Sequence, residues 1–360
     1  MWTRMTLIVG LGIAVMALAA CGGDDGGDSD VVSAPDDLDE PASGTLRVFA
    51  YSDTVYDEIL DPFREANPDV DLKVATFNSN KAAAAKLAGG FEADVVELCA
   101  DEMEPLTARG LVRPIDPSGI GEFGKLAFSD AEEVRDENGD VLFVPASAGP
   151  HGLVVNTDEV PEGVDSWEAM FDPEYAGNVA MASSALTAIG VTGLALGVDD
   201  PMNMSVEEIE EAKEHLLANR DNFRDFPESD SAMINLFKSG EVVLANGGRG
   251  DTQVLIDDGA PVEWVAPEEG ALSWVCGLAI TSDAENVDAA YKLLRYYASP
   301  EAQAASARFG FVAMNPDALA DVPQKFQETA DPRNLETAIP ETQPDNIEAY
   351  ERAWQEVVAG

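Results

Sequence analysis

Basic residues and histidines are scarce in this sequence. Its 360 residues include 21 Lys+Arg against 68 Asp+Glu, which gives a net charge of −47, and only two His. Because so acidic a chain would repel phosphates, the composition excludes nucleic-acid binding. We interpret most of the acidity as a solvated surface, of the kind that adaptation to salt favours, and attraction of a cationic ligand is the alternative.

Motifs of common catalytic sites are also absent. The chain has no G-x-S-x-G, H-E-x-x-H or P-loop, and one histidine such as His151 makes neither a metal site nor a catalytic base by itself. The Asn-Gly within residues 136–140 predicts a hairpin turn, and the later ligands of a calcium loop do not follow it. We therefore expect a protein that is not an enzyme and holds no metal or cofactor.

The apolar run near the N-terminus is short for a membrane span. It covers residues 5–20 and ends in Leu-Ala-Ala before Cys21, whereas a transmembrane helix needs about 20 apolar residues. The pattern resembles the lipobox of bacterial lipoproteins, in which Cys21 would be acylated and become the mature N-terminus. Residues 21–43 are rich in Gly, Asp, Ser and Pro, which predicts a flexible tether. We expect a signal peptide over residues 1–20 and an exported lipoprotein, anchored by its lipid in the periplasmic space or on the outer face of the cytoplasmic membrane.

Strand and helix patterns alternate after the tether. Strands are predicted over residues 46–51, 72–77 and 94–98, with amphipathic helices over 56–66 and 81–88 between them. This alternation predicts a parallel α/β sheet, in which ligands bind at the carboxyl ends of the strands. The length and the 46% hydrophobic content predict two domains.

The stretch PEEGALSWVCGLAI at residues 267–280 contains the strongest family signal. It predicts a turn and then a strand in which Trp274 and Cys276 point to the same face, and Ser299 with Pro300 predicts the start of a later helix. In this order the motifs resemble the C-terminal part of bacterial extracellular solute-binding proteins of the spermidine/putrescine-binding type. SWEAMFDPEYAGNVAM and GLVVNTDEV extend the resemblance, which covers roughly residues 45–315.

The resemblance implies an α/β fold of two lobes, the type II-like periplasmic-binding-protein fold, with the ligand between the lobes. Residues 44–150 and 275–318 would form the first lobe, and residues 151–274 and 319–360 the second, joined by two or three crossovers. Lobe closure around the solute would signal occupancy to a permease. The implied partners are a small-molecule solute and an ABC permease with its ATPase, and we expect a monomer.

Positions of the family's ligand site can be carried over one by one. The aromatic walls would be Tyr51, Trp274 and Phe311, but the three carboxylate positions fall on Ser184, Thr187 and Cys276. At about 1.5–3 kcal/mol per hydrogen bond to a charged group, their loss would cost on the order of 5–9 kcal/mol, and micromolar affinity is only about 8. Polyamine binding then requires other acids, for which Asp53, Glu97, Asp101 and Glu102 are candidates. The other expected ligand contacts are Ser52, Asn246, Arg249 and Gln343.

The family positions of Cys99 and Cys276 flank one wall of the first lobe. In an exported protein a pair of cysteines is more plausibly a disulfide than two free thiols. The resemblance therefore implies a Cys99–Cys276 disulfide.

Other functions remain open at this stage. Gly247-Gly248-Arg249-Gly250 could cradle an anion on backbone N–H groups, so the same fold could bind an amino acid, a small organic anion or a phosphonate. A surface lipoprotein that senses or adheres without transport is the alternative from another class. The match of Arg249-Gly250-Asp251 to an adhesion tripeptide is by default a coincidence of three residues. His151 would be a turn residue or a polar contact of the ligand.

Overall fold

The computed structural model describes residues 31–160 and 163–360. The predicted signal peptide, the acylation site Cys21 and the first part of the tether lie outside the described residues. None of the helices in the described part of the chain combines the length and the hydrophobicity that a membrane crossing requires.

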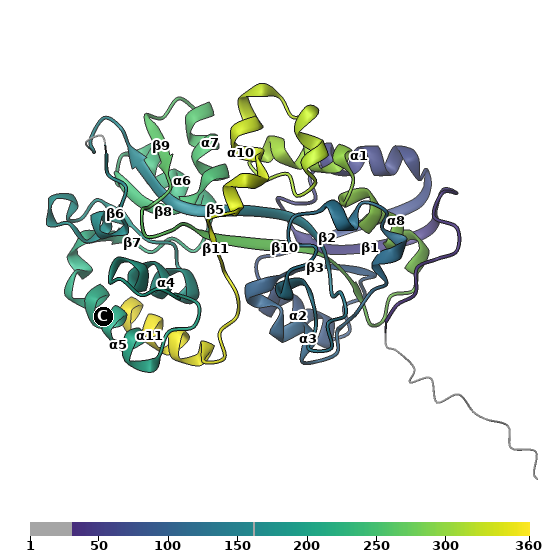
Figure 1. The fold of residues 1–360 in the computed structure, drawn as a ribbon, viewed down its shortest axis with the longest axis horizontal. Coiled ribbons are helices and arrows are strands. Elements are labelled where there is room, and N and C mark those ends of the chain that lie inside the picture. The colour runs from purple at the N-terminus through teal and green to yellow at the C-terminus, as the bar shows by residue number, and fades with distance from the viewer. Residues whose placement is uncertain (1–30, 161–162) are drawn as a thin grey trace, which may run out of the picture. The chain divides into compact units, whose positions relative to one another are not determined.

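One mixed sheet runs through residues 31–360, with α1, α7 and α10 on one side and α2, α4 and α11 on the other (Figure 1). Its strands are β1 (Ser43–Tyr51), β2 (Asp69–Phe77), β3 (Val95–Cys99), β4 (Val112–Arg113), β5 (Val144–Asn156), β6 (Val179–Ala180), β7 (Phe223–Asp225), β8 (Leu244–Gly248), β9 (Val262–Val265), β10 (Leu272–Thr281) and β11 (Ile339–Pro340). The α-helices are α1 (Asp57–Ala66), α2 (Asn80–Ala88), α3 (Glu104–Thr107), α4 (Ala185–Ala195), α5 (Val206–Ala218), α6 (Asp230–Ser239), α7 (Arg249–Asp257), α8 (Val287–Tyr297), α9 (Pro300–Ser306), α10 (Gln327–Ala330) and α11 (Ile347–Ala359).

The strand order along the sheet is β2-β1-β3-β10-β5-β8-β6-β7. β1 pairs in parallel with β2 and with β3, which confirms the parallel pairing predicted for this part of the chain. β10 is antiparallel to both β3 and β5, so the parallel arrangement does not extend to the middle of the sheet. The reason is that β5 and β10 are long connecting strands rather than members of β-α-β units.

Two large hydrophobic cores lie along this sheet. The first includes Phe49 of β1 and Tyr291 of α8, and the second includes Trp167 and Tyr350 of α11. β5 and β10 pass from one core to the other, since each strand places residues in both, and β11 pairs with the start of β10 as a third connection. We refer below to the parts around the first and second cores as the first and second lobes.

The C-terminal boundary between the lobes differs from the one expected. A separate cluster packs Ala304 of α9 with Ala318, Phe326 and Ala330, and Leu335 belongs to the first core. A boundary at residue 318 would therefore divide a packed cluster. The chain reaches the second core only at β11.

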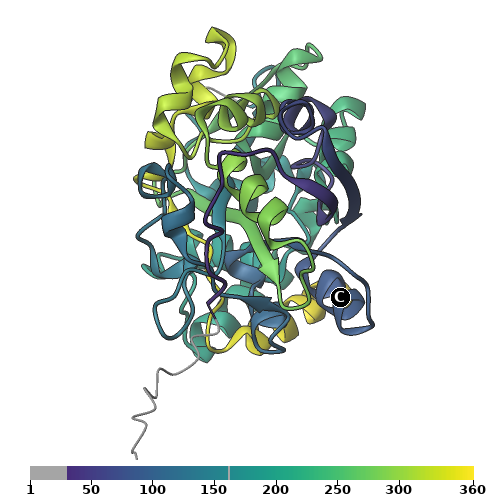
Figure 2. The ribbon, with the colours of Figure 1, turned by 90° about the vertical axis from the view of Figure 1, so that its right-hand side faces the viewer.

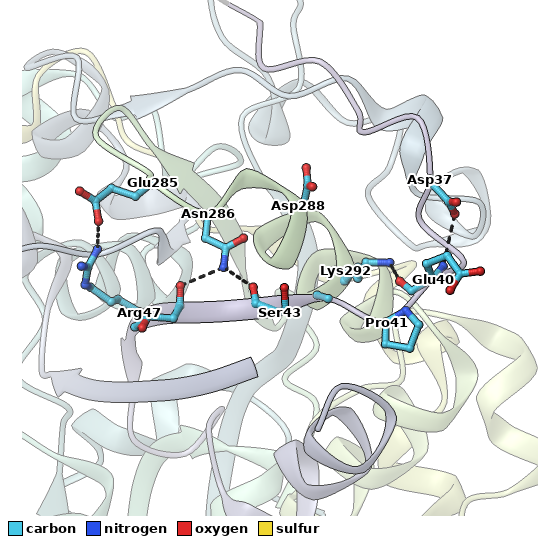
Figure 3. Close-up of a pocket in the computed structure, with 11 residues that line it drawn as sticks. Asp37, Glu40, Pro41, Ser43, Arg47, Glu285, Asn286, Asp288 and Lys292 are labelled. Carbon is cyan, nitrogen blue, oxygen red and sulfur yellow. Dashed lines mark hydrogen bonds and ion pairs between the residues drawn. The ribbon is translucent and has the colours of Figure 1, made fainter. Parts of the chain in front are cut away.

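Residues 31–43, expected to be part of a flexible tether, are bound to the first lobe. Val32 is buried, and its carbonyl accepts a 2.6 Å hydrogen bond from the hydroxyl of Tyr291. Farther along, Lys292 bonds the carbonyl of Glu40, and the Asn286 amide donates to the carbonyls of Ser43 and Thr45 (Figure 3). Figure 2 shows this segment running beside α8. The flexible tether expected over residues 21–43 therefore does not include residues 31–43.

Helices α8 and α9 begin and pack as their sequences predict. α8 buries Ala290, Tyr291 and Leu294 on one stripe, which is the spacing of an amphipathic helix. Ser299 caps α9 by accepting a hydrogen bond from the N–H of Ala302, and Pro300 occupies the first turn, where its missing N–H has no consequence.

Candidate ligand site

The connecting strands bring two of the predicted aromatic walls together. Trp274 of β10 lies opposite Gly149 of β5, and its indole covers that glycine so closely that a Cβ there would lie 3.0 Å from the ring. The ring of Phe311 meets the indole edge to face, with centroids 5.8 Å apart. Tyr51 has different partners, because its ring packs on Phe77, with centroids 4.6 Å apart.

A disulfide lies on the same strand as Trp274. Cys99 of β3 and Cys276 of β10 face each other in the antiparallel pairing, and their Sγ atoms are 1.96 Å apart. Both residues are buried. The position where the resemblance expects a ligand carboxylate is therefore part of a covalent link between two strands of the first lobe.

Two of the candidate acids serve the first lobe itself. Glu97 is only 1% exposed and accepts hydrogen bonds from the Tyr51 N–H at 2.9 Å and from the Thr54 hydroxyl at 2.6 Å. Burial raises the pKa of Glu97 to about 8, although these hydrogen bonds oppose the shift. Glu102 accepts from the Tyr51 hydroxyl at 3.0 Å and from the N–H of Asn80 at 3.0 Å. We assign both carboxylates a structural role at the end of β1.

An ion pair joins two of the lobe connections. Nδ1 of His151, in β5, lies 3.2 Å from Oε2 of Glu341, which follows β11, without the alignment of a hydrogen bond. The His151 side chain is 25% exposed and that of Glu341 is 3% exposed. Burial alone would lower the pKa of His151, but the Glu341 carboxylate outweighs it and raises the pKa to about 9. Burial would raise the pKa of Glu341, and the imidazolium and Thr187 lower it overall.

Ser184 and Thr187 hold this glutamate in place. The Thr187 hydroxyl donates to Glu341 Oε1 at 2.7 Å, and Ser184 Oγ lies 3.0 Å from the Thr187 hydroxyl while it caps α4. The two positions where the resemblance expects carboxylates thus present a carboxylate from another segment of the chain.

Further acids from both lobes interact electrostatically with His151 or with one another. Asp251, in the first turn of α7, places Oδ2 in the space left by the missing side chain of Gly248, and Gly248 lies opposite His151 in the β5–β8 pairing. Burial and the negative charges of Asp230 and Asp53 raise the pKa of Asp251, while His151 lowers it. Asp53, just after β1, has a raised pKa because of burial and of repulsion by Asp230 at the start of α6.

Asp101 adds a group from the first lobe. Burial and the negative charges of Glu341 and Glu102 raise its pKa to about 8, and His151 lowers it. Carboxylates from the first lobe, the second lobe and a connection between them therefore share one electrostatic environment. Of these acids, Asp230, Asp251 and Glu341 were not among the site residues predicted from the sequence. Among residues 31–160 and 163–360, no three His, Cys, Asp or Glu side chains are grouped so that they could hold a metal ion.

Arg249 has protein partners for its charge. Its guanidinium donates to Glu328 Oε1 at 2.7 Å and to Asn334 Oδ1 at 3.0 Å, and it stacks 5.1 Å from the centroid of the Trp264 ring. Because a carboxylate of the chain already neutralises it, the Gly-rich start of α7 gives no support to the predicted anion cradle.

Of the remaining residues expected to contact the ligand, two accept hydrogen bonds from the backbone of the protein and one is exposed. Asn246 is 1% exposed and accepts a 2.7 Å hydrogen bond from the N–H of Ala182. Gln343 accepts from the N–H of Glu104 at 3.2 Å, which ties the segment before α11 to α3 of the first lobe. Ser52 lies exposed in the turn after β1.

Two surface pockets in the described part of the chain lie on other residues. One, of about 640 Å³, is lined by residues such as Arg47, Glu285 and Asp288 (Figure 3). The other, of about 400 Å³, includes Asp199 and Glu211. Their charged groups are open to solvent, where ion pairs and charges interact weakly. We place the candidate site at His151 instead, because it pairs there with the buried carboxylate of Glu341 and because charged groups from both lobes interact with the pair.

Comparisons with known proteins identify the family of this chain. The family model described as "Bacterial extracellular solute-binding protein" matches residues 58–333. The spermidine/putrescine-binding periplasmic protein 1 of Haemophilus influenzae is 27% identical over 332 residues, which cover 88% of this chain and 90% of the relative. The spermidine/putrescine-binding periplasmic protein of Escherichia coli is 28% identical over 273 residues, with coverage of 72% and 74%. The crystal structure of the spermidine/putrescine ABC transporter substrate-binding protein PotD from Streptococcus pneumoniae superimposes with a TM-score of 0.76 at 20% identity, covering 88% of this chain and 99% of that one.

Proposed function

Since this chain belongs to the family of bacterial extracellular solute-binding proteins, we propose that it is the polyamine receptor of an ABC importer, of the spermidine/putrescine type. One observation supports this ligand most directly: carboxylates of both lobes, Asp53 on one and Asp230 with Asp251 on the other, interact electrostatically. The receptor would close its lobes on the solute and deliver it to the permease and its ATPase.

The chemistry of the site suits a chain of ammonium groups. Ammonium ions would bind Asp53 of the first lobe and Asp230 and Asp251 of the second through charge-assisted hydrogen bonds. The methylenes between them would lie along Trp274 and Phe311, where a nearby ammonium also gains a cation–π contact. At about 1.5–3 kcal/mol for each carboxylate, the three acids would supply on the order of 5–9 kcal/mol. This equals what the replaced family positions would lose.

Lobe closure also has a plausible contact surface. A Cβ on Gly310, which follows α9, would lie 2.4 Å from Cα of Gly250 in α7. Only a pair of glycines permits this approach of the two backbones, and Gly310 also has a left-handed φ of 93°. In our proposal the two glycines let the first turn of α7 reach the first lobe when ligand is bound.

We propose that the protein acts outside the cytoplasm as a monomer, moored to a membrane by a lipid on Cys21. Two observations support export: the relatives above are described as periplasmic, and residues 1–21 have the lipobox pattern. Because residues 31–43 contact the first lobe, the lipid anchor on Cys21 would be attached to the protein through that lobe.

Calorimetric titration of the purified full-length protein in detergent tests the ligand. We expect micromolar binding of putrescine or spermidine that weakens as salt is added, because screening reduces the attraction between ligand and carboxylates. Glutamate, γ-aminobutyrate and a phosphonate serve as comparison ligands. Binding of one of these without any amine would contradict the polyamine assignment and favour an amino-acid or anion importer. No binding of any solute would favour a sensing or adhesion lipoprotein.

A further inference from the structure

The ion pair of His151 and Glu341 places a positive charge of the protein inside the proposed amine site. Glu341 is fixed from three directions: Thr187 donates to Oε1, its N–H donates to the carbonyl of Ser273 at 2.7 Å, and Oε2 lies 3.2 Å from His151 Nδ1. A buried carboxylate without a partner is strongly unfavourable. The imidazolium therefore fills the place beside Glu341 that an ammonium of the ligand would otherwise occupy.

We infer that His151 is a specificity-determining residue of this site, which limits the ligand to two ammonium groups. The inference rests on the proposed function, because it concerns which amine the receptor prefers. Glu341 is neutralised by His151, and the raised pKa of Asp101, about 8, keeps that group mostly protonated at neutral pH. The carboxylates left for the ligand are Asp53 on one lobe and Asp230 with Asp251 on the other. A diamine bridges these two groups of acids, whereas the third ammonium of a triamine would have to approach the imidazolium.

The charged groups that act on His151 are consistent with its staying protonated at neutral pH. Glu341 follows β11, Asp230 begins α6, Asp251 lies in α7 and Asp101 lies in the 3₁₀ turn Ala100–Glu102. All four are carboxyl groups, and the negative charge of Glu341, Asp230 and Asp251 raises the pKa of His151 against the effect of burial. The imidazole of His151 is thus positively charged at neutral pH before the ligand binds.

The test compares two amines on variants of the only two histidines of the chain. The full-length protein, His151→Asn and His215→Asn are titrated with putrescine and spermidine at neutral pH. The ratio of the spermidine affinity to the putrescine affinity should rise about tenfold or more in His151→Asn, since the vacated place accepts one more charge-assisted hydrogen bond. It should not change in His215→Asn, where the lost ring packs on Phe171 of the second core.

Proton release on ligand binding is a second test, which needs no variant. It would not change if His151 had only a structural role. Spermidine binding to the unchanged protein should release a proton, because the third ammonium displaces the proton of His151, and putrescine binding should release less. Titrations in buffers of different ionisation enthalpy measure this difference. If both amines bind but the affinity ratio is the same in His151→Asn, or spermidine releases no extra proton, the inference is wrong and the polyamine assignment survives. If the unchanged protein binds neither amine, both fall.

Discussion

Replacing Asp251 with asparagine should weaken amine binding and stabilise the fold at the same time. The amide keeps the size of the side chain but removes the charge next to Gly248 and His151. The loss of one charge-assisted hydrogen bond, about 1.5–3 kcal/mol, corresponds to a fall in affinity of roughly 10- to 150-fold. The gain in stability follows from the raised pKa of Asp251, since burial and repulsion by Asp230 and Asp53 make its negative charge unfavourable in the folded protein.

Asp288→Asn provides a matched control for this variant. Asp288 also lies in the first turn of a helix, α8, but it is exposed and borders the surface pocket of Figure 3. Its removal should cost about 0.3–1 kcal/mol of stability, because a carboxylate at a helix N-terminus interacts favourably with the helix dipole. Its amine affinity should be unchanged. Asp251→Asn should therefore raise the stability, whereas Asp288→Asn should lower it. Only Asp251→Asn should weaken amine binding.

Calorimetric titration and thermal denaturation of both variants, at neutral pH and low salt, measure these quantities. The expected pattern is weaker binding with a higher Tm in Asp251→Asn, and unchanged binding with a slightly lower Tm in Asp288→Asn. Unchanged affinity in Asp251→Asn would refute the reasoning, as would an equal loss of affinity in both variants, which would indicate a general effect of net charge.

Three further predictions concern the aromatic wall, a buried acid and the disulfide. Trp274→Ala should weaken amine binding by about tenfold through loss of the methylene wall and the cation–π contact; titration calorimetry measures this, and undiminished affinity would exclude the indole from the site. The raised pKa of Glu97 makes its contribution to stability complete below about pH 4.5 and lost as the pH rises toward 8, so Glu97→Gln should flatten the fall in Tm between mildly acidic and mildly alkaline pH. Peptides containing Cys99 and Cys276 should be alkylated only after reduction, and reduction should lower the Tm, since closing so long a loop stabilises by at most about 5 kcal/mol; alkylation of both thiols in the unreduced protein would contradict the bond.

Much of the fold follows from local sequence patterns. The alternating elements of the first lobe and the start of α9 depend on residues close in sequence, so period and capping residues were sufficient to predict them. The boundary expected at residue 318 falls within a separate packed cluster, and alanines such as Ala318 and Ala330 give no strong sequence signal of which residues they pack against.

The charged groups of the site could not be predicted in the same way. Asp230 and Asp251 are first-turn acids of ordinary helices, in a chain with 68 acidic residues, and such acids usually only favour the helix dipole. Their significance comes from the pairing of β5 with β8, which joins segments far apart in sequence. The partners of Arg249 could not be predicted either, because Glu328 and Asn334, which accept its hydrogen bonds, lie 79 and 85 residues away in the sequence.

The exchange of acids between positions has a consequence for ligand choice. Binding of a flexible polyamine depends on the number of carboxylates and their separation, because each ammonium interacts mainly with the nearest negative charge. In this chain Ser184, Thr187 and Cys276 stand where the resemblance expects acids, and acids stand instead after β1 and in the first turns of α6 and α7. A site can keep its attraction for amines through such an exchange, but the separation of its charges changes. The amine that a relative at 27% or 28% identity binds therefore says little about which amine this chain prefers. The arrangement of charges around His151 is a better basis for predicting that preference.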